Sequence, residues 1–453
     1  MPTRPNVLVF LTDQQRWDTT GLHGNPLGLT PNLDRAGAEG THLAASFTCQ
    51  PVCAPARAAL QTGLYPTTTG CFRNGIALPA DQPTLAHHFG GAGYRTGYIG
   101  KWHLAAHGVV GPVPPEQRGG YQDWLAANLL EFTSRPYDTV VYDGHGVRRK
   151  LPGYRADALT DAAIRWVADR AAEPDQPFFL FLSLLEPHHQ NTSGDYPAPD
   201  GYRERYTDAW TPPDLRALGG TSAQHLPGYY GMVKRVDEAY GRLLDALTSL
   251  GIADDTIVAF TSDHGCHFRT RNGEYKRSPH DASIRVPTVL RGPGFTGGGR
   301  VNRPVTTVDL PPTLLDAAGV DVPPSMQGRS ILPLLHGAAA DWPEEAFIQV
   351  SESQVGRAVR TNRWLYAVTA PDADGWTDMS ADRYREDCLY DLKADPDQLN
   401  NLIHAASHRQ VADTMRTRLV SRMTAAGEPV PEIDPATERP SGQLIITATD
   451  AGQ

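Results

Sequence analysis

Lysine is scarce in this chain, which carries 41 basic residues among its 453 amino acids. Five of the 41 are lysine, so the other 36 are arginine. A compact ammonium group and a planar guanidinium are not interchangeable. The lysines that remain are therefore candidates for positions where arginine cannot serve, and Lys101 and Lys276 are two of them.

Long hydrophobic runs and excess positive charge are also missing. The longest largely apolar run, residues 178–185, is too short for a membrane span, which needs roughly 20 residues. The net charge is −10, from 51 acidic and 41 basic residues. We therefore expect neither a nucleic-acid partner nor a membrane partner.

Cysteine is sparse and odd in number, with residues at 49, 53, 71, 266 and 388. Such a set is a poor disulfide framework for a chain of this length. The apolar start at residues 6–11 ends at Asp13 before a secretory segment could form, and it fits a first core strand better. We therefore predict a cytoplasmic protein in which four of the cysteines are inert buried thiols and Cys53 is the exception.

Three continuous apolar runs predict buried strands: residues 6–11, 177–185 and 256–261. Residues 156–172 and 229–250 lie between these runs and have helical spacing. Strands that alternate with helices predict an α/β fold, a large mostly parallel sheet flanked by helices on both faces. Residues 190–226 are rich in Pro, Gly, Asp and Tyr and predict a long loop.

The pattern changes near residue 341. Short strand-like runs at 346–350, 356–368 and 388–392 are joined by polar turns, and a helix is expected at 409–426. We predict a catalytic domain over 1–344, followed by a smaller subdomain over 345–453 with a small antiparallel sheet and a packed helix.

Each of the three apolar runs ends in polar residues that bind metals or move protons. Asp13 and Gln14 follow the first run, His188 follows the second, and Asp263 and His264 follow the third. Ligands of open α/β sheets bind outside the carboxyl ends of the strands. The sequence therefore predicts that these five side chains meet at one edge of the sheet.

A fourth element is the segment CAPARAALQTG, residues 53–63. Pro55 suits a first helical turn, and the residues after it are good helix formers. Cys53 would then lie at a helix N-terminus, where backbone N–H groups favour an anion.

This segment resembles the signature of type I sulfatases, in the alkaline-phosphatase-like superfamily, in which the cysteine is oxidised to formylglycine. The resemblance covers nearly the whole chain. Further motifs carry it in order: NVLVFLTDQQ, GYIGKWH, EPH, TSDHG, KRSPHDASIRVP and LYDLKADPDQLNNL.

The resemblance implies a sulfuric ester hydrolase. It makes Cys53 the formylglycine nucleophile, matured by a formylglycine-generating enzyme, and Arg57 the residue that stabilises its hydrate. A divalent cation would be held by the modified Cys53 and the strand-end residues Asp13, Gln14, Asp263 and His264. The sulfate would be surrounded by Lys101, His103, His188 and Lys276.

The implied chemistry explains these residue types. Cations offset charge on the group being transferred while a hydrate oxygen attacks sulfur. His188 is expected to protonate the leaving oxygen, and His103 to act as the base that eliminates sulfate. A serine in place of the hydrate would stall as a stable sulfate ester, because it lacks the second hydroxyl.

Two positions depart from the commonest sulfatase pattern. That pattern has Asp-Asp after the first strand and Asp-Asn after the third, whereas this chain has Asp13-Gln14 and Asp263-His264. Hard oxygen ligands suit Ca²⁺, whereas the imidazole of His264 tolerates Mn²⁺ or another divalent cation better. We expect Ca²⁺ first. Formylglycine-dependent phosphonate monoester and phosphodiester hydrolases resemble Asp-Gln with Asp-His, so that activity is the first alternative. A non-catalytic binder of sulfated ligands is the second.

Polar residues near the motifs suit a polyhydroxylated ligand, which favours a sulfated carbohydrate as the substrate. The candidate substrate contacts are Arg73, Asn74, His189, His267, Arg271, Asn272 and Glu274.

Overall fold

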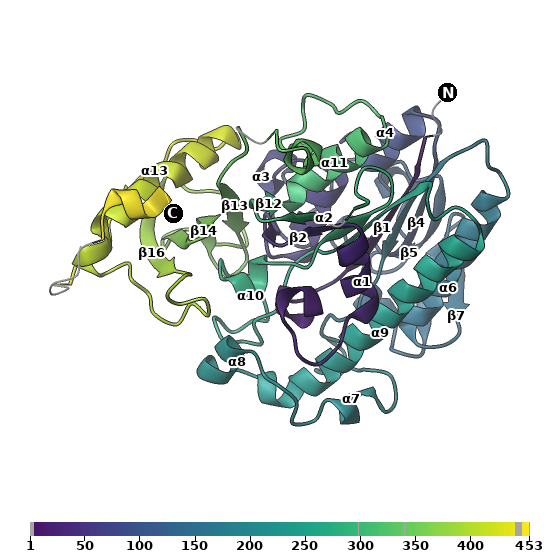
Figure 1. Ribbon diagram of the computed structural model, residues 1–453, viewed down its shortest axis with the longest axis horizontal. Helices are drawn as coiled ribbons and strands as arrows, with labels where there is room; N and C mark the ends of the chain where they lie inside the picture. Colours follow the sequence, from purple (N-terminus) through teal and green to yellow (C-terminus); the bar gives the residue numbers. More distant parts are fainter. Residues whose placement is uncertain (1–3, 298, 339–340, 440–445, 453) are drawn as a thin grey trace.

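The computed structural model describes residues 4–297, 299–338, 341–439 and 446–452. Its main body contains a ten-stranded mixed sheet (Figure 1). In spatial order the strands are β11 (Gly299–Val301), β2 (Thr41–Leu43), β10 (Val289–Arg291), β9 (Thr256–Ser262), β1 (Asn6–Thr12), β8 (Phe178–Ser183), β4 (Arg95–Lys101), β5 (Asp123–Ala127), β6 (Thr139–Asp143) and β7 (Arg148–Leu151).

The five central strands, β9-β1-β8-β4-β5, are parallel. Antiparallel pairs occur on both sides of them, where β10 pairs with β9 and β6 pairs with β5. The predicted fold class is thus confirmed, with five parallel strands at the centre of a mixed sheet and one further parallel pair, β11 with β2, at its edge. The three predicted apolar strands are β1, β8 and β9, which lie side by side.

Helices cover both faces, as the buried strand pattern predicts. Alternate residues of β1 enter two different cores: Val7 and Val9 face one, and Leu8 and Phe10 face the other. The first core is closed by α2 (Cys53–Thr62), α4 (Leu85–Gly91) and α11 (Leu310–Ala317). The second is closed by α1 (Pro31–Glu39), α6 (Arg155–Ala171) and α9 (Ser222–Ser249).

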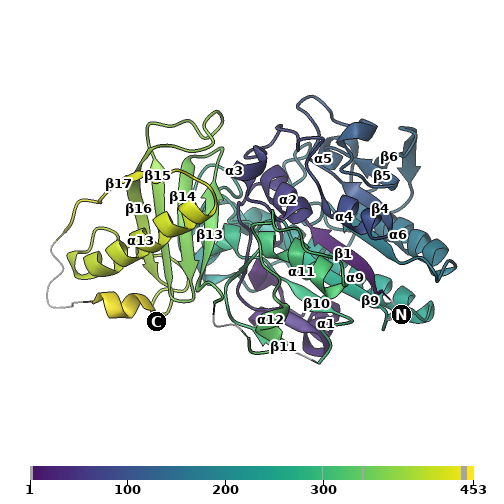
Figure 2. The same ribbon diagram turned by 90° about the horizontal axis from the view of Figure 1, so that it is seen from above.

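A second sheet of five strands forms the C-terminal part, with α13 (Arg409–Ala425) lying across it (Figure 2). Its strands, in order, are β13 (Glu345–Val350), β14 (Val355–Thr361), β15 (Trp364–Ala370), β16 (Arg383–Asp391) and β17 (Glu432–Asp434). The first four pair antiparallel, and β17 pairs parallel to β16. The domain boundary at residue 345 stays a prediction.

Short elements connect these parts. They are the two-stranded sheet of β3 (Ser46–Phe47) and β12 (Val305–Thr306) and the helices α3 (Pro66–Thr69), α5 (Leu130–Thr133), α7 (Tyr202–Arg205), α8 (Pro213–Leu218), α10 (Asp281–Ile284) and α12 (Leu332–Leu335). No helix among the described residues is long and apolar enough to cross a bilayer.

Two local predictions were wrong. The expected loop at 190–226 contains α7, α8 and the first residues of α9, because Leu226 and Tyr229 pack into a core with Phe268 that offsets the helix-breaking Pro227. The single strand-like run at 356–368 is a hairpin of β14 and β15. It turns at Asn362 and Arg363, and asparagine favours such turns.

Candidate active site

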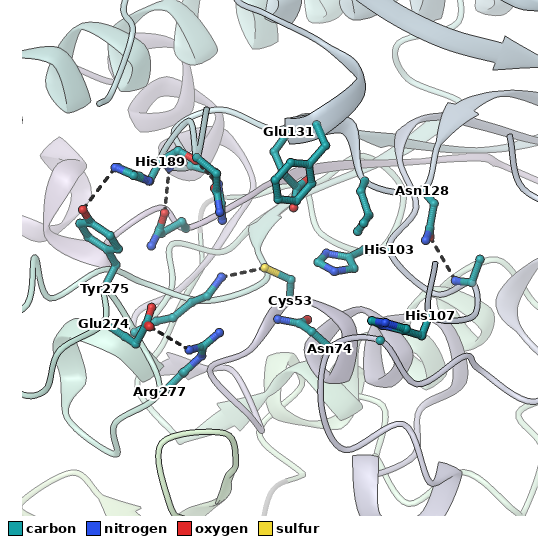
Figure 3. A pocket seen from close by; sticks show the side chains of 18 of the residues that line it. Cys53, Asn74, His103, His107, Asn128, Glu131, His189, Glu274, Tyr275 and Arg277 are labelled. Carbon is teal, nitrogen blue, oxygen red and sulfur yellow. Dashed lines mark hydrogen bonds and ion pairs between the residues drawn. The ribbon is translucent and has the colours of Figure 1, made fainter. Parts of the chain in front are cut away.

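Cys53 is the first residue of α2 and is buried, with 1% of its surface exposed. Its Sγ lies 2.8 Å from Lys276 Nζ, 3.3 Å from His264 Nε2 and 3.9 Å from Lys101 Nζ. Cys53 is central in the cavity shown in Figure 3. The four elements singled out in the sequence therefore converge on one atom.

The environment of Cys53 differs from that of the other cysteines. Burial raises the pKa of Cys53, but the charges of Lys101, Lys276 and His264 outweigh it and hold the pKa well below its usual value. Burial is the main cause that raises the pKa of Cys49 and of Cys71 to about 12. All four other cysteines are free and buried, as predicted.

The strand ends supply a buried acidic centre beside Cys53. The donor atoms of Asp13, Cys53, Asp263 and His264 lie within 4.8 Å of one another, and all four residues are buried. His264 Nδ1 lies 2.9 Å from the carbonyl oxygen of Gly265, so Nε2 is the ring nitrogen that faces the carboxylates, 3.6 Å from Asp13 Oδ1. Two carboxylates and an imidazole at this spacing fit a divalent cation.

The carboxylates have cationic partners as well. Burial and Cys53 raise the pKa of Asp13, whereas Lys101, His188 and Arg57 lower it, and the net pKa lies below the usual range. Burial and the neighbouring Asp13 raise the pKa of Asp263. Two facing carboxylates in a dry site therefore depend on positive charge around them.

Arg57 orients the acidic centre. Its Nη2 donates to Asp13 Oδ2 at 3.0 Å and its Nε donates to Asp263 Oδ2 at 3.1 Å. Its Nη1 donates to Ser183 Oγ at 2.7 Å and to the carbonyl of Lys101 at 2.9 Å. These bonds hold the two carboxylates in place, and the role of Arg57 toward the hydrate of residue 53 stays a prediction.

Gln14 lines the cavity, but its side chain is engaged elsewhere. The backbone N–H of His189 donates to Gln14 Oε1 at 3.0 Å. The backbone N–H of Gln14 donates to Asp263 Oδ1 at 3.1 Å. The metal-ligand role of Gln14 stays a prediction, while its backbone holds one of the carboxylates.

Lys101, His103 and His188 surround the same space. Lys101 Nζ contacts Asp13 Oδ2 at 2.7 Å and Glu131 Oε1 at 3.1 Å. His188 Nδ1 lies 2.6 Å from the carbonyl oxygen of His189, so its Nε2 faces the cavity, 4.0 Å from Asp13 Oδ1. His103 also lines the cavity, and its Nδ1 is buried without a hydrogen-bond partner.

The cavity has a volume of about 450 Å³. Three of the predicted substrate contacts line it: Asn74, His189 and Glu274. Asn74 Oδ1 also accepts the backbone N–H of Ala54 at 3.0 Å, which satisfies a free donor at the start of α2.

The structure does not bring the other predicted substrate contacts into the cavity. His267 Nε2 and Asn272 Nδ2 bond the carbonyl oxygen of Lys276, at 2.9 and 3.0 Å, and so hold the loop that carries the lysine. Arg271 donates to the carbonyl oxygens of Asp397 and Gln398, and Arg73 to that of Asn74. These polar side chains bond nearby backbone, a pattern that sequence reasoning cannot separate from ligand binding.

The structure adds cavity residues that sequence reasoning missed. Glu131 follows β5, so the polar-strand-end rule could have found it. Trp376 comes from the C-terminal part, and nothing in its local sequence indicates a role at the cavity. Glu352, also from the C-terminal part, does not line the cavity but contacts two residues that do. The Trp376 ring lies 5.5 Å from the guanidinium carbon of Arg277 and lines the cavity. Glu352 contacts Arg277 Nη2 at 2.5 Å and the N–H of Asn74 at 2.7 Å.

Backbone strain is concentrated around the cavity. Gln14, His103, Arg269 and Arg277 all line it, and their φ angles are 67, 60, 62 and 69°. A non-glycine residue in this left-handed region costs about 1–3 kcal/mol, which persists where the surroundings enforce it. Such strain is typical of functional sites.

Comparison with known proteins agrees with this geometry. The family model described as "Sulfatase" matches residues 5–320. The chain belongs to the sulfatase family. A second model, "N-sulphoglucosamine sulphohydrolase, C-terminal", matches residues 273–425 of this sulfatase.

Individual relatives cover nearly all of the chain. An ulvan-active sulfatase from Formosa agariphila is 32% identical over 91% of this chain and 82% of its own length. An N-acetylglucosamine-6-O-sulfatase from Bacteroides thetaiotaomicron is 26% identical over 89% and 84%. The solved structure of yidJ from Bacteroides fragilis has a TM-score of 0.80 at 26% identity, over 95% and 97% of the two chains.

One further solved structure bears on the reaction. A phosphonate monoester hydrolase from Silicibacter pomeroyi has a TM-score of 0.69 at 21% identity, over 93% of this chain and 95% of its own. This likeness shows a shared fold. The protein described here is an enzyme of the sulfatase type, and the identity of its ester substrate is a separate question.

Proposed function

We propose that this sulfatase hydrolyses a sulfate monoester of a carbohydrate at Cys53, after oxidation of that residue to formylglycine. The observation that carries the proposal is the placement of Cys53 Sγ between Lys276 Nζ and His264 Nε2, beside Asp13. Once oxidised and hydrated, the side chain of residue 53 supplies an oxygen nucleophile. A formylglycine-generating enzyme is its expected maturation partner.

The lysines bind the anionic group of the substrate. Lys276 lines the cavity, and the Nζ atoms of Lys276 and Lys101 lie 2.8 and 3.9 Å from Cys53 Sγ, where an ammonium group offsets the charge that sulfate oxygens carry in the transition state. Lys101 is held in place by Asp13 and Glu131. Arginine could not replace either lysine, because a fork of five donors needs more space than this buried centre leaves.

Two histidines handle protons. His188 Nε2 faces the cavity and protonates the departing alkoxide oxygen, while its Nδ1 stays bonded to the His189 carbonyl. His103 also lines the cavity and removes the proton from the second hydroxyl of residue 53, so that sulfate leaves. Each histidine therefore moves one proton: His188 gives one to the leaving oxygen, and His103 takes one from the second hydroxyl.

A divalent cation fits the acidic centre. Asp13, Asp263 and His264 would hold it with residue 53, and Gln14 is the further predicted ligand. When bound, such a cation supplies charge stabilisation to the sulfate group. Calcium is the first candidate and manganese the second, because two hard carboxylates are combined with one imidazole.

Two features support a carbohydrate substrate. The rim of the cavity carries two exposed aromatic rings, Phe132 at 52% and Trp376 at 45% exposure, on which the apolar face of a sugar ring can pack. Its walls combine these rings with amide, carboxylate and imidazole groups that can bond hydroxyls. The relatives named for ulvan and for N-acetylglucosamine 6-sulfate are consistent with this.

Phosphonate or phosphodiester hydrolysis remains the second candidate function. The Asp-Gln and Asp-His pairs and the fold shared with a phosphonate monoester hydrolase favour it. A purified enzyme that turns over nitrophenyl sulfate faster than bis-nitrophenyl phosphate supports the sulfatase proposal. The reverse preference would overturn it, and the matched variant Cys53→Ala should abolish whichever activity is found. A cytoplasmic location is likewise proposed from the sequence alone.

A further inference from the structure

A second cavity of about 270 Å³ lies where the main body meets the C-terminal sheet. Arg285 and Arg300 enter it from the main body, and Arg360 enters it from β14. No described residue lines both this cavity and the one around Cys53. The second cavity is therefore separate from the active site.

Positive charge exceeds negative charge in this cavity. Among the described residues that line it, Asp281 is the one carboxylate. Arg360 donates two hydrogen bonds to that carboxylate, from Nε at 2.8 Å and from Nη2 at 2.9 Å. Arg285 Nη1 stays 3.9 Å from Asp281, and Arg300 Nε donates to the neutral amide oxygen of Asn302 at 3.0 Å.

Arg285 is held rigidly and has an unused donor. Its guanidinium carbon lies 3.8 Å from the centre of the Trp17 ring, and Nη2 donates to the carbonyl oxygen of Ala44 at 2.6 Å. Its Nε is buried without a hydrogen-bond partner. Burial lowers the pKa of Arg285 to about 10, with Arg360 and Arg300 adding to the decrease against Asp281 and Asp18.

The positive charges of these arginines also lower the pKa values of two nearby histidines. Burial, together with the charges of Arg300 and Arg285, lowers the pKa of His42 to about 4. His23 Nε2 lies 3.3 Å from His42 Nε2, and burial and Arg285 also hold the pKa of His23 well below its usual value. Among the described residues that line the cavity, an anion would therefore meet three arginines and one carboxylate, that of Asp281.

We propose that this cavity is a second binding site for a tetrahedral oxyanion, a sulfate or phosphate group. Guanidinium forks bind such groups through paired N–H donors, and the amides of Asn302 and Asn362 stand at the same cavity. Because Asn362 Nδ2 also bonds the carbonyl oxygen of Asn302 at 3.0 Å across the junction, a bound anion would join the main body to the C-terminal sheet.

Calorimetric titration with sodium sulfate at constant ionic strength tests this site. The titration uses Lys276→Ala, which removes the cation facing Cys53 and so weakens sulfate binding in the first cavity. We expect Lys276→Ala to keep one sulfate site, and Lys276→Ala with Arg300→Gln to bind about tenfold more weakly or worse. The matched control is Arg149→Gln, an exposed arginine of β7 outside both cavities, which should leave the affinity unchanged.

The source of the oxyanion is distinguished by three ligands: sulfate, glucose 6-sulfate and glucose. Binding of sulfate alone assigns a free anion, and binding of glucose 6-sulfate assigns a saccharide-borne group. Equal sulfate affinity with and without Arg300, or no sulfate binding to Lys276→Ala, overturns the proposal. Arg300→Gln alone should hydrolyse nitrophenyl sulfate within about twofold of the wild-type rate, since surface substitutions have small effects. The proposed function is therefore judged separately.

Discussion

Lys276 Nζ lies 2.8 Å from Cys53 Sγ and 2.9 Å from His264 Nε2, so one ammonium group joins the nucleophile position to the acidic centre. The lysine reaches this place from a polar loop. His267 and Asn272 fix its backbone by bonding its carbonyl oxygen. Lys276 is therefore buried beside Cys53, although its sequence neighbours are mostly charged and polar.

Replacing Lys276 with alanine should lower kcat/KM for nitrophenyl sulfate about 10²–10³-fold, the usual effect of removing one transition-state donor. Lys276→Arg should recover little of this loss, because the planar fork does not match the single point contact. A loss below about threefold on Lys276→Ala would contradict the assigned role.

His188→Ala should affect substrates according to their leaving groups. An alkyl or sugar alkoxide needs protonation as it departs, whereas nitrophenolate needs little. We therefore expect a loss about 10²-fold or more on a sugar sulfate and a much smaller loss on nitrophenyl sulfate. Equal losses on the two substrates would assign His188 a different role.

Arg269 is predicted to bind a further anionic group on the substrate. It lines the cavity over the Tyr275 ring, at 4.7 Å, and has no carboxylate partner within 4.0 Å in the described part of the chain. Arg277, in contrast, is paired with Glu274 and Glu352. Arg269→Gln should lower kcat/KM about tenfold for a sulfated sugar that also carries a carboxylate.

The same variant should leave nitrophenyl sulfate turnover within about twofold, because surface substitutions have small effects. Arg205→Gln is the matched control, since Arg205 is also an exposed arginine over a tyrosine ring, at 4.5 Å, but lies outside the cavity. An equal change in kcat/KM for substrates with and without the carboxylate would show that Arg269 does not bind that group.

Removing the metal should cost both activity and stability. Free Ca²⁺ at about 100 times its dissociation constant adds about 2.7 kcal/mol to the free energy of unfolding. A chelator should therefore lower the melting temperature and turnover, and Ca²⁺ or Mn²⁺ should restore both. The change in melting temperature on adding the chelator should vanish in Asp263→Asn. An equal change in that variant would mean that the metal binds elsewhere.

The sequence predicted the parts of the site that follow directly from strand ends and one helix start. Asp13, His188 and Asp263 come after adjacent parallel strands, so their convergence could be inferred from the apolar runs and from the rule that ligands bind at the carboxyl ends of such strands. The place of Cys53 at a helix start followed from Pro55 and the helix formers after it, and its role as nucleophile was implied by the family resemblance. The apolar runs and the helix start depend on neighbouring residues in the sequence, so they can be recognised without knowledge of the tertiary structure.

The remaining parts depend on contacts between distant segments. Trp376 lines the cavity from the C-terminal part, and Glu352 from the same part accepts the backbone N–H of the lining residue Asn74; nothing in their local sequence indicates this. Arg57 was expected near the hydrate, but its donors go to carboxylates and to Ser183 on a neighbouring strand. The start of α9 was misplaced, because tertiary packing offsets the local preference of Pro227 to end a helix.

Mass spectrometry of the peptide that contains residue 53, from protein purified out of its native cell, tests the central proposal most directly. The account predicts the mass of a formylglycine residue, an aldehyde that reacts with hydrazide probes. A peptide that retains the full mass of cysteine and reacts as a thiol, in enzyme that still cleaves nitrophenyl sulfate, would contradict it.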